Sequence, residues 1–126
     1  MVLSTEETAI QQAHRNMVSS SVADMARVLQ DLLSRRMTAY MAGVKDGKSV
    51  ARWANGETDI RYESEQRLRT AYEIAQLLAS FESPKIVRGW FVGLNPQLED
   101  TSPAEAIHEG RLQEAMAAAR AFIAGG

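Results

Sequence analysis

The sequence predicts an all-α fold. Apolar residues recur at the spacing of a helix face in several segments, and no segment alternates apolar and polar residues as a half-buried strand does. Ser83-Pro84 and Ser102-Pro103 each place a capping serine before a proline, a common way to begin a helix. At 126 residues, with 45% hydrophobic and 24% charged residues, the chain has the size of one globular domain, or of two small subdomains that share a core.

Two helices are expected before the centre of the chain. Ser4 or Thr5 can cap a helix over residues 4–16, but its apolar face is thin, so residues 1–19 are interpreted as either a frayed arm or a docked helix. Residues 21–34 form a clearer pattern, because Ser21 and Asp24 resemble a capping box and a wide apolar stripe follows them. The stripe consists of Val22, Met25, Ala26, Leu29, Leu32 and Leu33.

The centre of the chain has the pattern of a helix, a turn and a second helix. Residues 35–43 predict the first helix, with Met37, Tyr40 and Met41 facing inward. Asp46-Gly47 marks the turn, residues 48–55 predict the second helix, and Gly56 ends it. The second helix turns Val50, Trp53 and Ala54 inward and a polar face outward, consisting of Lys48, Ser49, Arg52 and Asn55. This arrangement matches a helix-turn-helix, whose second helix reads DNA.

The charge distribution favours the same segment as a DNA-binding surface. The whole chain has a net charge of −2, but residues 35–69 hold eight basic and five acidic side chains, a net charge of +3. Arg52 is the candidate for a base contact, since a guanidinium can bridge guanine O6 and N7. Lys48, Ser49 and Asn55 are candidates for phosphate or base-edge contacts. The alternative is a solvated face on a scaffold that does not bind DNA.

The distal half begins with the longest helical pattern, residues 65–81, which is apolar over much of its circumference and is expected to join the two halves. The Ser83-Pro84 start leads into an apolar face of Ile86, Val87, Trp90, Phe91 and Leu94, and Asn95-Pro96 ends that helix. A short helix follows Ser102-Pro103 through Ile107 and ends at Gly110. The closing helix, residues 111–123, has the stripe Leu112, Ala115, Met116, Ala119, Phe122 and Ile123.

Taken together, these segments resemble the Xre/MbcA/ParS antitoxins, the partners of RES-domain toxins. The resemblance covers roughly residues 20–124. Residues 49–57, Arg67-Leu68-Arg69 and the helix to Leu78 are similar to the family's Xre-like helix-turn-helix half. The distal half is similar in its order of a Trp-containing helix, Asn-Pro, Leu, Ser-Pro, a short helix, Gly and a closing helix that ends in Gly. Here these are Trp90, Asn95-Pro96, Leu98, Ser102-Pro103, Ile107, Gly110 and Gly125.

The resemblance implies a bacterial type II antitoxin that binds and neutralises a RES-domain toxin, an enzyme that degrades NAD. Residues 20–79 would form the helix-turn-helix domain and residues 80–126 the toxin-binding domain. Operator DNA would be a second partner, and the chain would act as a homodimer or as a hetero-oligomer with the toxin. The implied toxin-binding residues are Trp90, Phe91, Leu94, Asn95, Pro96, Ile107, Gly110, Phe122, Ile123, Gly125 and Gly126. The sequence departs from the family at its closing Gly. In the family, apolar residues often follow that Gly, whereas here Ala124 is followed only by Gly125 and Gly126.

Other readings of the same residues remain open. The chain could be a stand-alone helix-turn-helix transcriptional regulator, or a structural or oligomerising helical domain. Trp90, Phe91 and Leu94 could be interface anchors or ordinary core residues. The acidic residues of the distal half could be a solvated face, or a rim that steers a basic partner: Glu99, Asp100, Glu105, Glu109 and Glu114.

The residue content argues against several classes of protein. The chain has no cysteine and only two histidines, so we expect no metal site and no cofactor, and the lack of cysteine fits a reducing cytoplasm. No nucleophile–base pair stands at local spacing and no glycine-rich loop can cradle a phosphate, so we expect no enzymatic activity. No apolar run reaches the roughly 18 residues that span a membrane.

Overall fold

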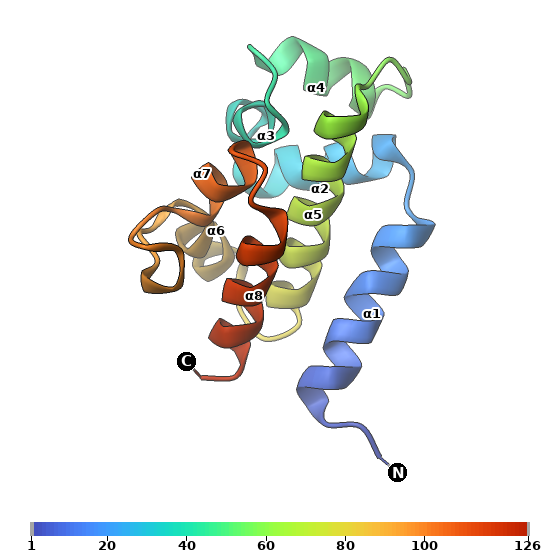
Figure 1. Ribbon diagram of the computed structural model, residues 1–126. Coiled ribbons are helices and arrows are strands. Elements are labelled where there is room, and N and C mark those ends of the chain that lie inside the picture. Colours follow the sequence, from blue (N-terminus) through green and yellow to red (C-terminus); the bar gives the residue numbers. More distant parts are fainter. Residues whose placement is uncertain (1, 126) are drawn as a thin grey trace.

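The computed structural model describes residues 2–125, which form eight α-helices and one short 3-10 turn (Figure 1). Within these residues there is no β-strand, only an isolated bridge between Asn95 and Thr101. The predicted all-α fold is therefore confirmed. The elements are α1 (Thr5–Ser19), α2 (Val22–Leu33), α3 (Arg35–Ala42), α4 (Gly47–Ala54), α5 (Tyr62–Ala79), α6 (Pro84–Val92), η1 (Pro96–Leu98), α7 (Pro103–His108) and α8 (Leu112–Ile123).

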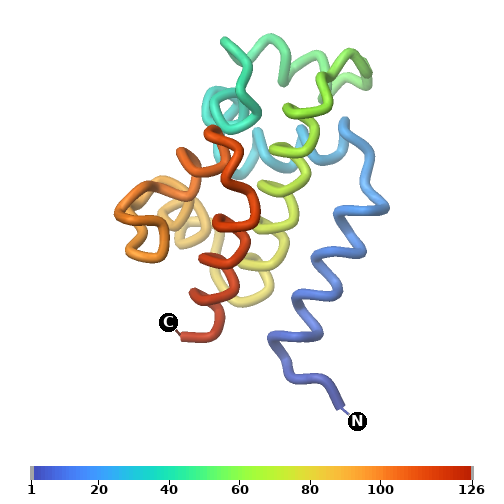
Figure 2. Tube along the Cα trace, in the orientation of Figure 1, coloured from blue at the N-terminus to red at the C-terminus, as the bar shows by residue number. Residues whose placement is uncertain are grey.

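Helix α5 is the centre of the molecule. It contacts α1, α2, α3, α6, α7 and α8, and Figures 1 and 2 show it running between α1 and α8. Leu68, Ile74 and Leu78 on α5 are no more than 1% exposed. The buried apolar residues form one cluster that reaches from Ala13 on α1 to Ala119 on α8. The two predicted subdomains thus share a core, and the boundary between residues 79 and 80 stays a prediction.

Side-chain caps fix most helix starts. The hydroxyls of Ser83 and Ser102 accept hydrogen bonds from the backbone N–H groups of Ile86 and Glu105, as the two Ser-Pro pairs predict. Ser21 caps α2 in the same way through the N–H of Asp24. These bonds satisfy backbone donors that would otherwise lack a partner.

The N-terminal segment is a docked helix. Helix α1 packs on α5, with Ala13 buried in the contact. Polar pairs supplement this thin apolar face, because His14 lies 3.4 Å from the carboxylate of Glu73 and the Asn16 amide donates to the Gln76 side chain at 3.3 Å. Of the two interpretations left open by the sequence, the structure therefore shows the helix.

Two predicted boundaries and several burial assignments were wrong. Helix α5 begins at Tyr62 within the expected connection, and it ends before Phe81, whose side chain is 37% exposed. Helix α6 ends at Val92 with Gly93 as its C-cap, so Leu94 leaves the apolar face and is 76% exposed. Ile86 is 46% exposed on the same helix.

Helix α3 buries Met41 as predicted and packs Met37 partly against the core, but it does not bury Tyr40. Tyr40 is 38% exposed and Met37 is half-buried, whereas Thr38, Ala39, Met41 and Ala42 face the core. Small side chains let α3 lie close to its neighbours, and the buried Thr38 hydroxyl donates to the backbone oxygen of Ser34 at 2.8 Å. A buried threonine is acceptable there because its hydroxyl is paired.

We predict that Ile74→Ala lowers the free energy of unfolding by about 2–5 kcal/mol, because it leaves a cavity in the centre of α5. Ile86→Ala is the matched control, since it removes the same atoms from a half-exposed position and should cost less than about 1 kcal/mol. Urea denaturation of both variants measures the difference. Equal losses would show that α5 is not the centre of the core.

Candidate interaction sites

The first candidate site is the outer face of α4. Asp46 caps this helix by accepting from the N–H of Lys48 at 2.9 Å. Val50, Trp53 and Ala54 are buried, as predicted, and the Trp53 side chain is 2% exposed. Gly47 lies close to the Arg35 side chain, because a Cβ at this position would lie 2.6 Å from Cγ of Arg35 and would displace that side chain. The inward face thus holds α4 against the core.

The predicted DNA-contacting residues lie on the opposite face of α4. Lys48 and Asn55 are exposed, and Ser49 and Arg52 are half-buried. The Arg52 guanidinium lies 3.4 Å from Asp59 and 3.5 Å from the Ser49 hydroxyl. Because Asp59 offsets the charge of Arg52, a base contact would require Arg52 to leave this pair. DNA binding, and the use of α3 and α4 as a helix-turn-helix, stay predictions.

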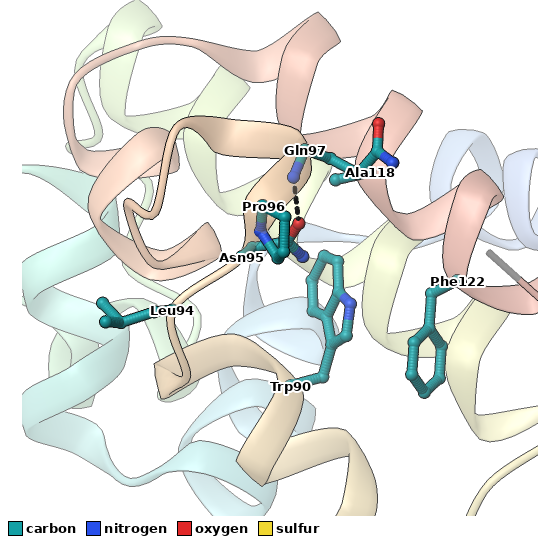
Figure 3. A pocket seen from close by; sticks show the side chains of 7 residues that line it. All are labelled: Trp90, Leu94, Asn95, Pro96, Gln97, Ala118 and Phe122. Carbon is teal, nitrogen blue, oxygen red and sulfur yellow. Dashed lines mark hydrogen bonds between the residues drawn. The ribbon is translucent and has the colours of Figure 1, made fainter.

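The second candidate site is a surface hollow of about 240 Å³ between the end of α6, η1 and α8 (Figure 3). Its lining combines two aromatic rings with two primary amides. The lining residues are Trp90, Leu94, Asn95, Pro96, Gln97, Ala118 and Phe122. Figure 3 shows the side chains of Trp90 and Phe122 facing the same space, whereas the Leu94 side chain points outward from the rim.

The loop that forms one wall of the hollow is fixed by hydrogen bonds. The side-chain oxygen of Asn95 accepts from the N–H of Gln97 at 2.9 Å, and the N–H of Asn95 donates to the backbone oxygen of Thr101 at 3.2 Å. Leu98 is fully buried beneath the loop. Glu99 and Asp100 have φ of 58° and 62°, a left-handed conformation that costs roughly 1–2 kcal/mol per residue for an L-amino acid. The contacts of the loop therefore maintain a strained turn.

Trp90 contributes a buried hydrogen-bond donor to this site. Its side chain is 9% exposed and packs edge-on against Phe91, with ring centroids 5.2 Å apart. The Nε1 group is buried and has no hydrogen-bond partner among the described residues. In Figure 3 the indole nitrogen lies on the side of the ring that faces Phe122. An unpaired buried donor costs about 1–3 kcal/mol, so an acceptor brought to this atom would be favourable.

The structure separates the predicted toxin-binding residues into two groups. Trp90, Leu94, Asn95, Pro96 and Phe122 all line the hollow. The others lie elsewhere: Phe91 and Ile107 are fully buried in the core, Gly110 ends α7 with φ of 82°, Ile123 is half-buried on α8, Gly125 is exposed, and Gly126 lies outside the described residues. Of these, Phe91 supports the hollow through its edge-on contact with Trp90. Toxin contact by any of these residues stays a prediction.

Arg111 connects the loop to α8, a feature that the sequence reading missed. Its guanidinium lies 2.7 Å from Glu114, 3.3 Å from Glu99 and 3.6 Å from Glu109. The hydrogen bond from Arg111 lowers the pKa of Glu114, and the same bond raises the pKa of Arg111. The spacing of Arg111 and Glu114 on one helix could have indicated this pair, but the contact with Glu99 depends on the fold.

The two histidines have structural contacts. His108 stacks on Tyr40 with ring centroids 4.2 Å apart, and its Nδ1 lies 2.6 Å from the backbone oxygen of Tyr40, which joins α7 to α3. Burial and then the charges of Glu105 and Glu109 raise the pKa of Tyr40.

Among residues 2–125, no three potential ligands cluster as a metal ion requires. None of the helices described there has the length and apolar character to cross a membrane.

Comparison with known proteins gives no family model that matches this chain, no similar curated protein and no similar solved structure. The resemblance to the Xre/MbcA/ParS antitoxins therefore rests on the motifs of the sequence alone.

Proposed function

We propose that the chain is an antitoxin that neutralises a RES-domain toxin by direct binding through α6, η1 and α8. The observation that carries the proposal is the hollow itself, because five residues that the resemblance marks as toxin-binding line one surface. Fixed walls and a buried unpaired donor are features of a site prepared for a partner.

The hollow alone is too small for a stable complex, since protein–protein interfaces bury about 800 Å² on each partner. An exposed apolar side chain adds to the surface at its rim, since Leu94 is 76% exposed there. An aromatic centre with an exposed rim fits the usual anatomy of an interface, in which a few central side chains supply most of the affinity.

We predict that the chain copurifies with a RES-domain toxin encoded next to it when both are expressed together. Leu94→Asp should abolish or strongly weaken the complex, because it places a charge on the apolar rim. Val18→Asp is the matched control, since Val18 is 64% exposed on α1, away from the hollow, and its replacement should leave the complex intact. Pull-down and size-exclusion chromatography measure the outcome. Failure to form any complex with the neighbouring gene's product would refute the antitoxin proposal.

A second candidate function is DNA binding through α4. It is supported by the outward position of Lys48, Arg52 and Asn55 and by the positive charge of residues 35–69. A single module of this kind buries only about 600–1,000 Å², so useful operator affinity requires a homodimer or a hetero-oligomer with the toxin that reads a two-fold site. An antitoxin with this activity could repress its own operon, and a stand-alone regulator would have this activity alone.

For DNA binding we predict opposite effects of two variants. Arg52→Ala should weaken operator binding by about 1–3 kcal/mol, whereas Asp59→Asn should tighten it, because it frees the Arg52 guanidinium. Arg15→Ala on α1 is the control for the loss of one exposed positive charge. Mobility-shift titrations at several salt concentrations measure affinity and salt slope. If Arg52→Ala changes neither, α4 is not the helix that reads DNA.

A further inference from the structure

Two surface hollows lie along α8: the one beside Trp90, and a second one at the start of the helix, lined by Gly110, Arg111, Leu112, Gln113 and Glu114. Glu114, Ala118 and Phe122 are spaced at i, i+4 and i+8 on α8, so they follow one stripe of the helix. Phe122 faces Trp90 at one end, with ring centroids 6.4 Å apart. Glu114 lies two turns away, about 12 Å along the helix axis. An occupant that follows this stripe therefore meets an aromatic end and an acidic end.

The acidic end keeps negative charge in excess. The carboxylates of Glu99, Glu109 and Glu114 all pair with the guanidinium of Arg111, and the nearby guanidinium of Arg67 donates to the backbone oxygen of Ile107, so three negative charges meet two positive ones. The Glu99 side chain is 87% exposed and the Glu114 side chain is 57% exposed, so a partner can reach both. The side chain of Arg111 is only 24% exposed and is occupied by these contacts. This end thus favours a cationic group.

The aromatic end provides apolar surface and one donor. Trp90 Nε1 has no acceptor within the described chain, and the atom is covered in the free protein. Phe122 is half-buried in the last turn of α8, on the side to which the indole nitrogen points in Figure 3. A partner that moves the Phe122 ring aside can pack an apolar side chain against the indole and bring a backbone carbonyl to Nε1.

We infer that the surface from the hollow beside Trp90 to the second hollow at Glu114 binds a linear segment of the partner protein in which an apolar side chain is followed by a lysine or an arginine. The apolar side chain packs between Trp90 and Phe122, a carbonyl accepts from Trp90 Nε1, and the basic side chain pairs with Glu99 and Glu114. An extended chain advances about 3.3 Å per residue, so the two side chains stand about three or four residues apart. The inference rests on the proposed function and names the chemistry of the toxin surface that α6, η1 and α8 recognise.

A random peptide library displayed on phage, selected against the full chain, tests the motif directly. The expected result is an enriched apolar residue with Lys or Arg three or four positions later. A synthetic peptide of the enriched sequence is then titrated into the ¹⁵N-labelled chain. The Trp90 Nε1–H resonance should move as the new hydrogen bond forms, and the Trp53 resonance should not. Trp53→Phe assigns the two signals, because Trp53 is the chain's other tryptophan and lies on α4.

Two variants test the two ends of this surface. Trp90→Phe keeps an aromatic ring and removes the donor, so it should weaken peptide binding by roughly two- to tenfold. Glu99→Gln should weaken binding at low salt, and its effect should diminish at high salt because exposed charges are screened. Glu7→Gln on α1 is the matched control, as another exposed glutamate. Thermal unfolding of each variant shows whether the fold is preserved.

Several results would overturn the inference. These are an acidic or purely apolar consensus, the absence of any enriched peptide, a Trp90 signal that moves only when the chain associates with itself, or binding that is unchanged in Trp90→Phe and Glu99→Gln. The proposed function fails separately. If the toxin complex forms with both variants, the recognition of a linear segment is refuted and the antitoxin function is retained. If the peptide binds but no toxin complex forms, the antitoxin function is refuted and the recognition of a linear segment is retained.

Discussion

The burial of α5 is the constraint on which the rest of the structure depends. Leu68, Ile74 and Leu78 lose almost all contact with water, and six other helices contact this one helix. A fully buried aliphatic side chain contributes about 1.5–3 kcal/mol relative to an exposed one, so a helix with this much buried surface sets the positions of its neighbours. The geometry of both candidate sites therefore depends on α5.

The two sites depend on α5 in different ways. Helix α8 packs directly on α5 and carries Ala118 and Phe122 to the hollow, while α4 reaches α5 through α2 and α3. The two tryptophans illustrate the difference, because each has a buried Nε1 without a hydrogen-bond partner in residues 2–125. Trp53 anchors α4 with its ring, so the missing bond is a cost to be offset by packing. Trp90 lies at the wall of a hollow, where a partner can supply the acceptor.

Much of the fold could be predicted from local pattern, and the site could be predicted only in part. The Ser-Pro pairs located the starts of α6 and α7, and the wide apolar stripe of residues 65–81 indicated the central helix. Tyr40 and Leu94 were misplaced because helix rotation and helix ends depend on close packing and on Gly93. The resemblance marked Trp90 and Phe122, but it could not show that η1 brings Gln97 to them or that Arg111 reaches Glu99. These contacts join segments distant in the chain, and periodicity carries no information about them.

One core around α5 holds both sites, and native-state hydrogen exchange measures whether this core opens as a single unit. The buried amides of α2, α5 and α8 should exchange with the same free energy, equal to that of global unfolding measured with denaturant. Amides of α7 and α8 that open at a distinctly lower free energy, while α2 and α5 stay protected, would contradict it. The chain would then consist of two units that fold separately, and the hollow would lack the rigid support described above.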